Sequence, residues 1–443
     1  MHLARQHTWI RKGQTKDNQM VELSLASDNP IGIHSNDHLG FDRYLDPLVS
    51  LLANPKTETP FTVGVFGTWG SGKTSLLKLL DARLENDHPG KFLRVWFNPW
   101  VHRAEPNLLV PLLHTLHDTL DAQPLEKFKA SASKIFDVLV RLGAGFFLKH
   151  VTAEAVSMED LDKLEEKYLK THGRVESEMR KLRTTLQTEA TKLAEGGTKL
   201  VLIIDDLDRC DPTQIVDLLD SVKLFFDLKD LFIILAVDKE VVDRGVQIKY
   251  KDFQFAKDRT AAIGAEYLEK MVQLPLSLFP LHRTQVETFV SKFNPPAALQ
   301  PHLTLLRDTL DPNPRKLKRA LNILSLIAQV KAATPALHNL MDDLIARLIV
   351  LQVQSGEIFS EVVRQPDLLL ALEATYAGDL DPKSVQDYFK KYGVRAKEIQ
   401  DFCQLYYAPG NYLSTLFRGK PFETEEKGAK LLPVYLAMFG GKA

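Results

Sequence analysis

At 443 residues, the chain is longer than a single hydrophobic core usually supports, so we expect two or three domains. Hydrophobic residues make up 44% and charged residues 26%, a balance that excludes an extensively disordered protein. Lys and Arg number 56 against 57 Asp and Glu, so overall charge favours neither a nucleic-acid nor a membrane partner.

Cysteine content, the N-terminal residues and the apolar stretches bear on where the protein resides. The two cysteines, Cys210 and Cys403, predict neither a disulfide framework nor a metal site, which is typical of a reducing compartment. Residues 1–20 lack the apolar region of a secretory signal. Charged residues interrupt the apolar stretch 135–151, which leaves it too short to span a bilayer. We therefore expect a cytoplasmic protein without membrane attachment.

Apolar runs predict four strands, at residues 61–66, 92–97, 200–204 and 231–237. Continuous runs of this kind are typical of parallel strands that helices cover on both faces. Helices are expected after Lys73, Pro106, Pro212 and Lys239, where they supply the crossover connections. The pattern predicts an α/β fold with a mostly parallel sheet flanked by helices.

A long segment, residues 105–197, separates the second predicted strand from the third and exceeds an ordinary crossover, so it predicts a helical insertion. A heptad-like seam runs through Leu161, Tyr168, Val175 and Leu182, and through Met179, Leu186 and Leu193. Because the run is short, a helical hairpin packed on its own domain is favoured over an intermolecular coiled coil.

The character of the chain changes at residues 275–280, after which helical segments follow without clear strands, beginning at 285–293. We expect a C-terminal α-helical lid and tail. The predicted division is an N-terminal extension (1–34), an α/β core (35–104 and 198–280), the insertion (105–197), a helical lid (281–330) and a C-terminal helical domain (331–443).

A glycine-rich loop carries the strongest functional signal. Residues 67–74, GTWGSGKT, match the spacing G-x-x-x-x-G-K-[ST] and lie between a predicted strand and a predicted helix. Glycines let backbone N–H groups turn towards phosphate oxygens, and the helix N-terminus adds its positive dipole end. Lys73 is expected to reach the β- and γ-phosphates and Thr74 to ligate Mg²⁺. The candidate nucleotide-binding residues are Gly67, Thr68, Trp69, Gly70, Ser71, Gly72, Lys73, Thr74 and Ser75.

Acidic residues follow the third predicted strand, at the carboxyl edge where open α/β sheets bind ligands. Asp205 is the expected magnesium ligand. Asp206 suits the orientation or deprotonation of an attacking water, and Asp208 competes for that role. Arg209 is expected to pair with a neighbouring acid rather than with phosphate.

Two further residues are candidates for contact with the phosphates. Asp238 follows the fourth predicted strand and can either sense the γ-phosphate or cap the next helix. Arg315 begins a cationic helix in the predicted lid, where closure would bring an arginine onto developing phosphate charge. The guanine-recognition pattern [NT]-K-x-D is not found after the later strands, so ATP with Mg²⁺ is expected.

Several segments together carry a resemblance to a known family: DHLGFDRY (37–44), GVFGTWGSGKTSLL (64–77), FNPW (97–100), LVLIIDDLDRCDP (200–212), LAVDK (235–239), YLEKMVQLPL (267–276) and NPRKLKRALN (313–322). With these segments the chain resembles the KAP-family P-loop NTPases, a branch of the ATPases with an added strand between the two Walker motifs. The resemblance implies that Leu39 and Gly40 lie near the adenine, that Asp205 and Asp206 serve magnesium and water, and that Arg315 is the lid arginine.

The resemblance also bears on partners. Many relatives carry transmembrane helices between the Walker motifs, but residues 105–197 are charged and heptad-like here, so membrane attachment is not carried over. Prokaryotic relatives are often linked to defence against phage or plasmids. Because the remaining sequence has no nuclease, protease or TIR-like signature, a defence role would require a separate effector protein.

The leading hypothesis is an ATPase, acting as a homo-oligomer, that couples ATP hydrolysis to a conformational change or to assembly. The alternative is a nucleotide-dependent scaffold or sensor with little turnover that binds an effector. A nucleic-acid remodelling motor ranks third, since no run of the sequence demonstrates a basic channel.

Overall fold

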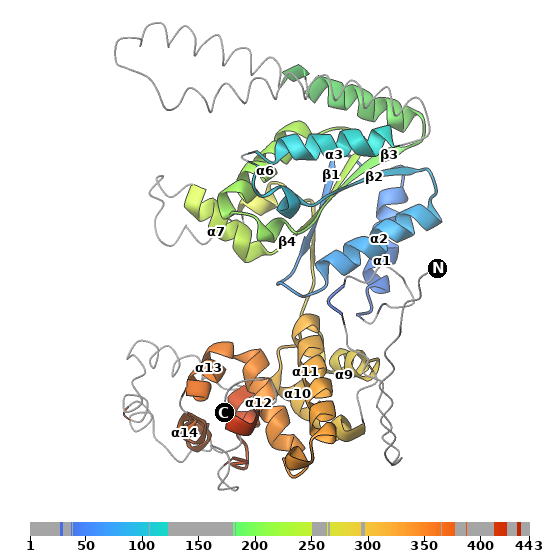
Figure 1. Cartoon of the computed structure of the whole chain (residues 1–443). Helices are drawn as coiled ribbons and strands as arrows, with labels where there is room; N and C mark the ends of the chain where they lie inside the picture. The colour runs from blue at the N-terminus through green and yellow to red at the C-terminus, as the bar shows by residue number, and fades with distance from the viewer. Residues whose placement is uncertain are drawn as a thin grey trace, which may run out of the picture. The chain divides into compact units, whose positions relative to one another are not determined.

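The computed structural model describes residues 27–29, 37, 39–105, 107–122, 180–181, 183–249, 264, 266–293, 297–364, 366–376, 387, 412–422 and 432–435. The chain divides into two compact units (Figure 1). One, the α/β unit, is Asn29–Leu281, and the other, the helical unit, combines Met1–Asp28 with His282–Ala443.

A five-stranded parallel sheet forms the centre of the α/β unit. Its strands are β1 (Phe61–Phe66), β2 (Phe92–Phe97), β3 (Lys199–Ile204), β4 (Leu231–Val237) and β5 (Leu274–Ser277). The order across the sheet is β2-β3-β4-β1-β5, so β4 lies between the strands that lead to the glycine-rich loop and to the acidic cluster. The predicted parallel α/β sheet and its added strand are confirmed.

The hydrophobic pattern does not predict β5, which pairs with β1 from Val63↔Leu274 to Phe66↔Ser277. Proline within an apolar run argues against a strand, because it cannot donate to the ladder. Pro275 is tolerated because β5 is a short strand at the edge of the sheet and needs to pair on one side only.

Helices cover both faces of this sheet, as parallel strands require. Figure 1 shows α1 and α2 on one face and α3 and α6 on the other. The helical elements of the unit are α1 (Asp42–Ala53), α2 (Lys73–Asp87), η2 (Pro99–His102), α3 (Leu109–Asp121), η4 (Leu207–Arg209), α6 (Pro212–Phe225) and α7 (Lys239–Lys249). The predicted helices after Lys73, Pro106, Pro212 and Lys239 correspond to α2, α3, α6 and α7, whereas α1, which contains Pro47, is not predicted.

The two described ends of the predicted insertion pack on the sheet. Leu112 and Leu116 of α3, and Leu186 and Leu193 of the helical residues 183–195, belong to the same buried cluster as the side chains of β2, β3 and β4. Leu186 and Leu193 are therefore core residues of the α/β unit. The other residues of the heptad-like seam, and the apolar stretch 135–151, lie outside the described residues.

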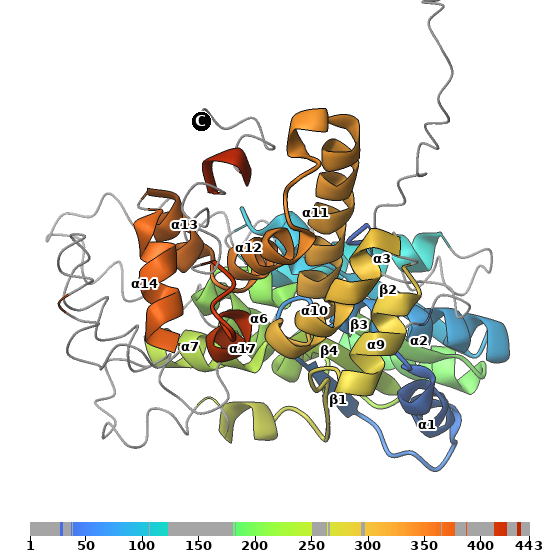
Figure 2. The ribbon, with the colours of Figure 1, turned by 90° about the horizontal axis from the view of Figure 1, so that it is seen from below.

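The described residues of the helical unit contain helices and no strand. Figure 2 shows α9, α10, α11 and α12 of this unit, and Leu306, Leu317, Leu321 and Ile345 are among its buried side chains. The helices are α9 (Arg283–Ser291), η6 (Ala297–His302), α10 (Leu303–Thr309), α11 (Pro314–Ala333), η7 (Pro335–Leu337), α12 (Asp342–Gln354), α13 (Gly356–Arg364), α14 (Asp367–Tyr376) and α17 (Tyr412–Leu416). Among the described residues, no helix has the length and hydrophobicity needed to cross a membrane.

Candidate nucleotide-binding site

The glycine-rich loop, residues 67–74, joins β1 to the first turn of α2. Gly70 and Gly72 have φ angles of 86° and 101°, which glycine adopts without strain. The Ser71 hydroxyl is buried and makes no hydrogen bond within the described part of the chain, and a Cβ at Gly67 would lie 2.5 Å from it. A loop folded closely around a buried, unpaired hydroxyl fits a phosphate group, whose oxygens accept hydrogen bonds.

Gly72 allows the chain before α1 to pack closely on the loop, because it has no side chain. A Cβ at Gly72 would lie 2.8 Å from Phe41 Cζ and 3.0 Å from Leu39 Cδ1. Gly72→Ala is therefore expected to lower the free energy of unfolding, measured in urea, by roughly 2–4 kcal/mol, the sum of φ strain and overpacking. Gly90→Ala is the matched control, because Gly90 has a φ of 73° but open space around it. Equal losses in both variants would contradict the packing role.

Lys73 is buried with its ammonium group surrounded by oxygen atoms. Its Nζ donates to the carbonyl oxygen of Gly67 at 2.8 Å, to that of Thr68 at 3.4 Å and to Asp208 Oδ2 at 2.9 Å. The side chains of Lys73 and Asp208 are both 7% exposed. Because Asp208 lies in η4, this ion pair joins the loop after β1 to the acidic turn after β3.

Thr74 and Asp205 form a second contact between the same two segments. The Thr74 hydroxyl donates to Asp205 Oδ1 at 3.2 Å. Burial raises the pKa of Asp205 to about 6, the Thr74 hydrogen bond opposes this shift, and the charge of Asp206 adds to it. A buried carboxylate of this kind gains from a bound cation, and hydroxyl and carboxylate oxygens are the ligands that Mg²⁺ prefers. Both side chains fit a magnesium ion.

Asp206 is held by two donors, one on each carboxylate oxygen. Asn98 Nδ2 donates to Oδ2 at 3.1 Å, and Arg209 Nε lies 2.9 Å from Oδ1. The backbone of Asp206 is left-handed, with φ 57°, a conformation that Asp and Asn adopt more readily than most residues. Arg209 therefore pairs with a neighbouring acid, and the acids Asp206 and Asp208 point to different partners.

The motifs do not predict Asn98 as a site residue, although its position directly after a predicted strand could have indicated it. β2 lies beside β3 with Phe97 opposite Ile204, so the residues that follow the two strands meet at one edge of the sheet. The Asn98 side chain also accepts the backbone N–H of Trp100 at 3.0 Å, which fixes its orientation at the start of η2. Strand order, which the motifs do not contain, is needed to pair Asn98 with Asp206.

The turn before α1 brings Leu39 to the loop. The Asp37 carboxylate accepts the N–H groups of Leu39 and Gly40, both at 3.0 Å, and Gly40 has a φ of 70°. Leu39 is buried and lies against Gly72. Of the two residues that the family resemblance assigns to the adenine, Leu39 thus contacts the glycine-rich loop, and Gly40 follows it in the same turn.

The other predicted site residues lie after β4, in the helical unit and in the loop itself. Asp238 follows β4 directly, and its carboxylate accepts the N–H of Glu240 at 3.1 Å, so it caps the start of α7. Arg315 lies in the first turn of α11 in the helical unit, with Nε 3.4 Å from Asp28 Oδ2. Trp69 is 67% exposed, whereas Ser75 is buried in the first turn of α2. The roles of Asp238 and Arg315 at a nucleotide stay predictions.

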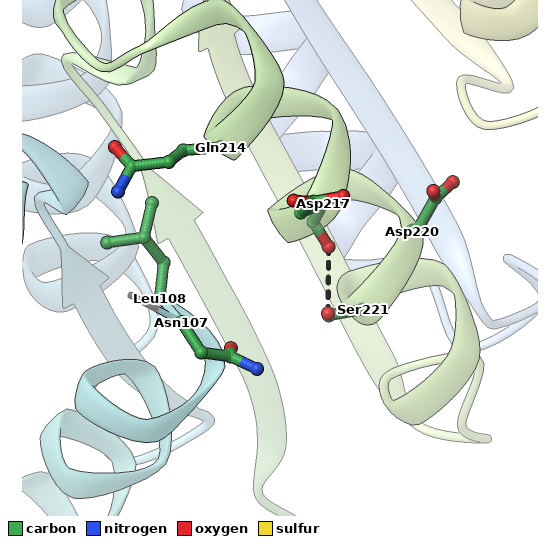
Figure 3. Close-up of a pocket in the computed structure, with 6 residues that line it drawn as sticks. All are labelled: Asn107, Leu108, Gln214, Asp217, Asp220 and Ser221. Atoms are coloured by element: carbon green, nitrogen blue, oxygen red, sulfur yellow. Dashed lines mark hydrogen bonds between the residues drawn. The ribbon is translucent and has the colours of Figure 1, made fainter. Parts of the chain in front are cut away.

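A separate hollow of about 310 Å³ lies along α6 (Figure 3). Several of its polar groups serve the fold: Gln214 donates to the carbonyl oxygens of Arg103 and Glu105, while Asp217 and Asp220 both pair with Lys249. The residues that line it are Asn107, Leu108, Gln214, Asp217, Asp220 and Ser221. None of them belongs to the glycine-rich loop or to the acidic turn.

Several known proteins are similar to this chain. The phage T7 exclusion protein of Escherichia coli K12 is 23% identical over 378 residues, which are 72% of this chain and 48% of that protein. The chain thus spans about half the length of that relative. An uncharacterized protein of Methanocaldococcus jannaschii is 26% identical over 174 residues, 31% of this chain and 86% of that protein.

Among solved structures, that of the Aeropyrum pernix ORC1 protein in complex with DNA covers 88% of this chain and 83% of its own, at 13% identity and a TM-score of 0.35. That score is too low to bear on function. The sequence model of the KAP family P-loop domain matches residues 41–330, which contain the glycine-rich loop, the acidic turn, α9, α10 and most of α11. This match covers more than half of the chain, which therefore belongs to the KAP family of P-loop proteins.

Proposed function

We propose that the chain is a magnesium-dependent ATPase that couples ATP binding and hydrolysis to a change of conformation or assembly. One observation carries the proposal: two side-chain contacts, Lys73 with Asp208 and Thr74 with Asp205, join the glycine-rich loop to the acidic turn. Phosphate-binding and acidic groups are thereby brought within reach of one substrate. Membership of the KAP P-loop family supports nucleotide binding.

The loop residues bind and orient the phosphates in this proposal. Lys73 contacts the β- and γ-phosphates, and the Ser71 hydroxyl donates to a phosphate oxygen. Thr74 and Asp205 hold Mg²⁺, which neutralises the charge that develops on the phosphate oxygens. Arg315 is proposed to stabilise the same charge from the helical unit.

Asp206 is the proposed base. A water oxygen attacks the γ-phosphorus, its proton passes to the Asp206 carboxylate, and ADP leaves. Asp206 is favoured over Asp208 because Asn98 Nδ2 and Arg209 Nε hold its two carboxylate oxygens in one orientation. ATP is the proposed nucleotide, with Leu39 and Gly40 beside the adenine.

The output of hydrolysis is proposed to be conformational, in a homo-oligomer that engages an effector protein. The similarity to the phage T7 exclusion protein supports a role in defence against phage. Because the chain spans about half of that relative, this role is proposed on the similarity of the shared part.

The experiment that tests the proposal is phosphate release from ATP across a series of protein concentrations, with GTP as comparator and with Mg²⁺ or EDTA. We expect turnover with Mg-ATP that exceeds turnover with GTP, stops in EDTA and, for an oligomeric enzyme, rises per subunit with concentration.

Asp205→Asn should need about tenfold more Mg²⁺ for half-maximal rate, since one anionic ligand is lost. ATP binding without phosphate release at any concentration would reject the ATPase and favour a nucleotide-dependent sensor.

A further inference from the structure

The buried ion pair between Lys73 and Asp208 has a direct bearing on how a nucleotide enters the site. A lysine ammonium group has three N–H donors. All three have an acceptor here, because Nζ lies 2.8 Å from the Gly67 carbonyl oxygen, 3.4 Å from that of Thr68 and 2.9 Å from Asp208 Oδ2. A phosphate oxygen that bonds to Lys73 has to displace at least one of them.

Asp208 is the partner that a phosphate displaces most readily. The Asp208 carboxylate is a negative charge held next to the Lys73 ammonium group, where the negatively charged phosphate has to bind. Two negative charges that share one buried site repel each other strongly. The carbonyl oxygens of Gly67 and Thr68 are neutral and belong to the loop itself. Asp208 and Lys73 are both 7% exposed, so water screens this competition little.

We propose that Asp208 acts as a built-in counter-ion that occupies Lys73 in the nucleotide-free protein and leaves it when the phosphates bind, so that it sets nucleotide affinity. This deepens the proposed function and rests on nucleotide binding at this loop. Asp208 then lowers the affinity for the nucleotide and favours its release. Asp206, which contacts other partners, serves the reaction.

The test is the affinity of the full chain for ATP, measured by titration calorimetry in EDTA so that magnesium ligands do not contribute. Asp208→Asn keeps the shape of the side chain and removes its charge, and it is expected to bind ATP about tenfold more tightly than wild type. Asp208→Glu restores the charge and should bind more weakly than Asp208→Asn. Asp211→Asn is the matched control, because it makes the same change of charge at an exposed residue near the turn and keeps an α6 cap.

Thermal unfolding of each variant checks that it is folded. Tighter ATP binding by Asp208→Asn, but not by Asp211→Asn, supports the counter-ion role. This conclusion holds even if the wild type releases no phosphate, because that result rejects only the proposed hydrolysis. Unchanged or weaker binding by folded Asp208→Asn, while the wild type binds ATP, overturns the counter-ion role and leaves the proposed function standing. Absence of ATP binding by both proteins overturns the proposed function and the counter-ion role with it.

Discussion

Lys73→Met is expected to lower the affinity for ATP about 100-fold and to abolish phosphate release. The ammonium group is buried beside the glycine-rich loop, where charge-assisted hydrogen bonds to phosphate are each worth about 1.5–3 kcal/mol. Methionine keeps the length of the side chain but supplies no donor. Binding of ATP, measured by calorimetry, and phosphate release are the two readouts.

Lys78→Met is the control for this prediction, since Lys78 is exposed on the same helix, α2. Lys73→Met also leaves the Asp208 carboxylate buried without its cation, so stability has to be measured separately. The double variant Lys73→Met/Asp208→Asn removes that unpaired charge and should still fail to bind ATP. ATP binding by Lys73→Met at wild-type affinity would reject the site. Loss of phage restriction in cells that express Lys73→Met, but not Lys78→Met, would connect the site to the proposed defence role.

Asp206→Asn is expected to lower kcat by about 10²–10⁴ and to leave ATP affinity within about threefold of wild type. The amide cannot take a proton from water. It can still accept the hydrogen bond from Asn98, and asparagine tolerates the left-handed backbone at this position, where φ is 57°. The variant should therefore hold ATP without hydrolysing it, as single-turnover phosphate release and equilibrium binding would show.

Asp118→Asn, an exposed change of the same chemistry on α3, controls for the loss of one negative charge. Full turnover by Asp206→Asn, together with loss of turnover in Asp208→Asn, would move the base from Asp206 to Asp208. Parallel loss of ATP binding and turnover in Asp206→Asn would instead assign Asp206 to nucleotide binding.

The fold was predictable where local sequence determines it. Continuous apolar runs identify β1 to β4, because parallel strands are buried on both faces. β5 escapes the same argument, since Pro275 is acceptable only once the strand is known to lie at an edge. In α1, Pro47 interrupts the helical pattern in a similar way, and packing against α2 is what compensates.

The candidate site, like the fold, was predictable only where local sequence determines it. The spacing of residues 67–74 identifies the loop, because neighbours in the chain form it. The sequence favours Asp206 as the base but leaves Asp208 as a competitor, and their different three-dimensional partners, Asn98 and Lys73, are not visible in it. Those contacts depend on strand order and on the left-handed backbone of Asp206, neither of which a residue pattern contains.

The packing of the glycine-rich loop has a mechanical consequence. The chain passes between the two units at two places, after Asp28 and after Leu281. On the first side, Leu39 and Phe41 lie against Gly72; on the second, the N–H of Leu278 donates to the Phe66 carbonyl oxygen at 2.7 Å, next to Gly67. Within the α/β unit, the described segments that lead towards these two crossings thus contact opposite ends of one loop, so a displacement of that loop would displace both segments together.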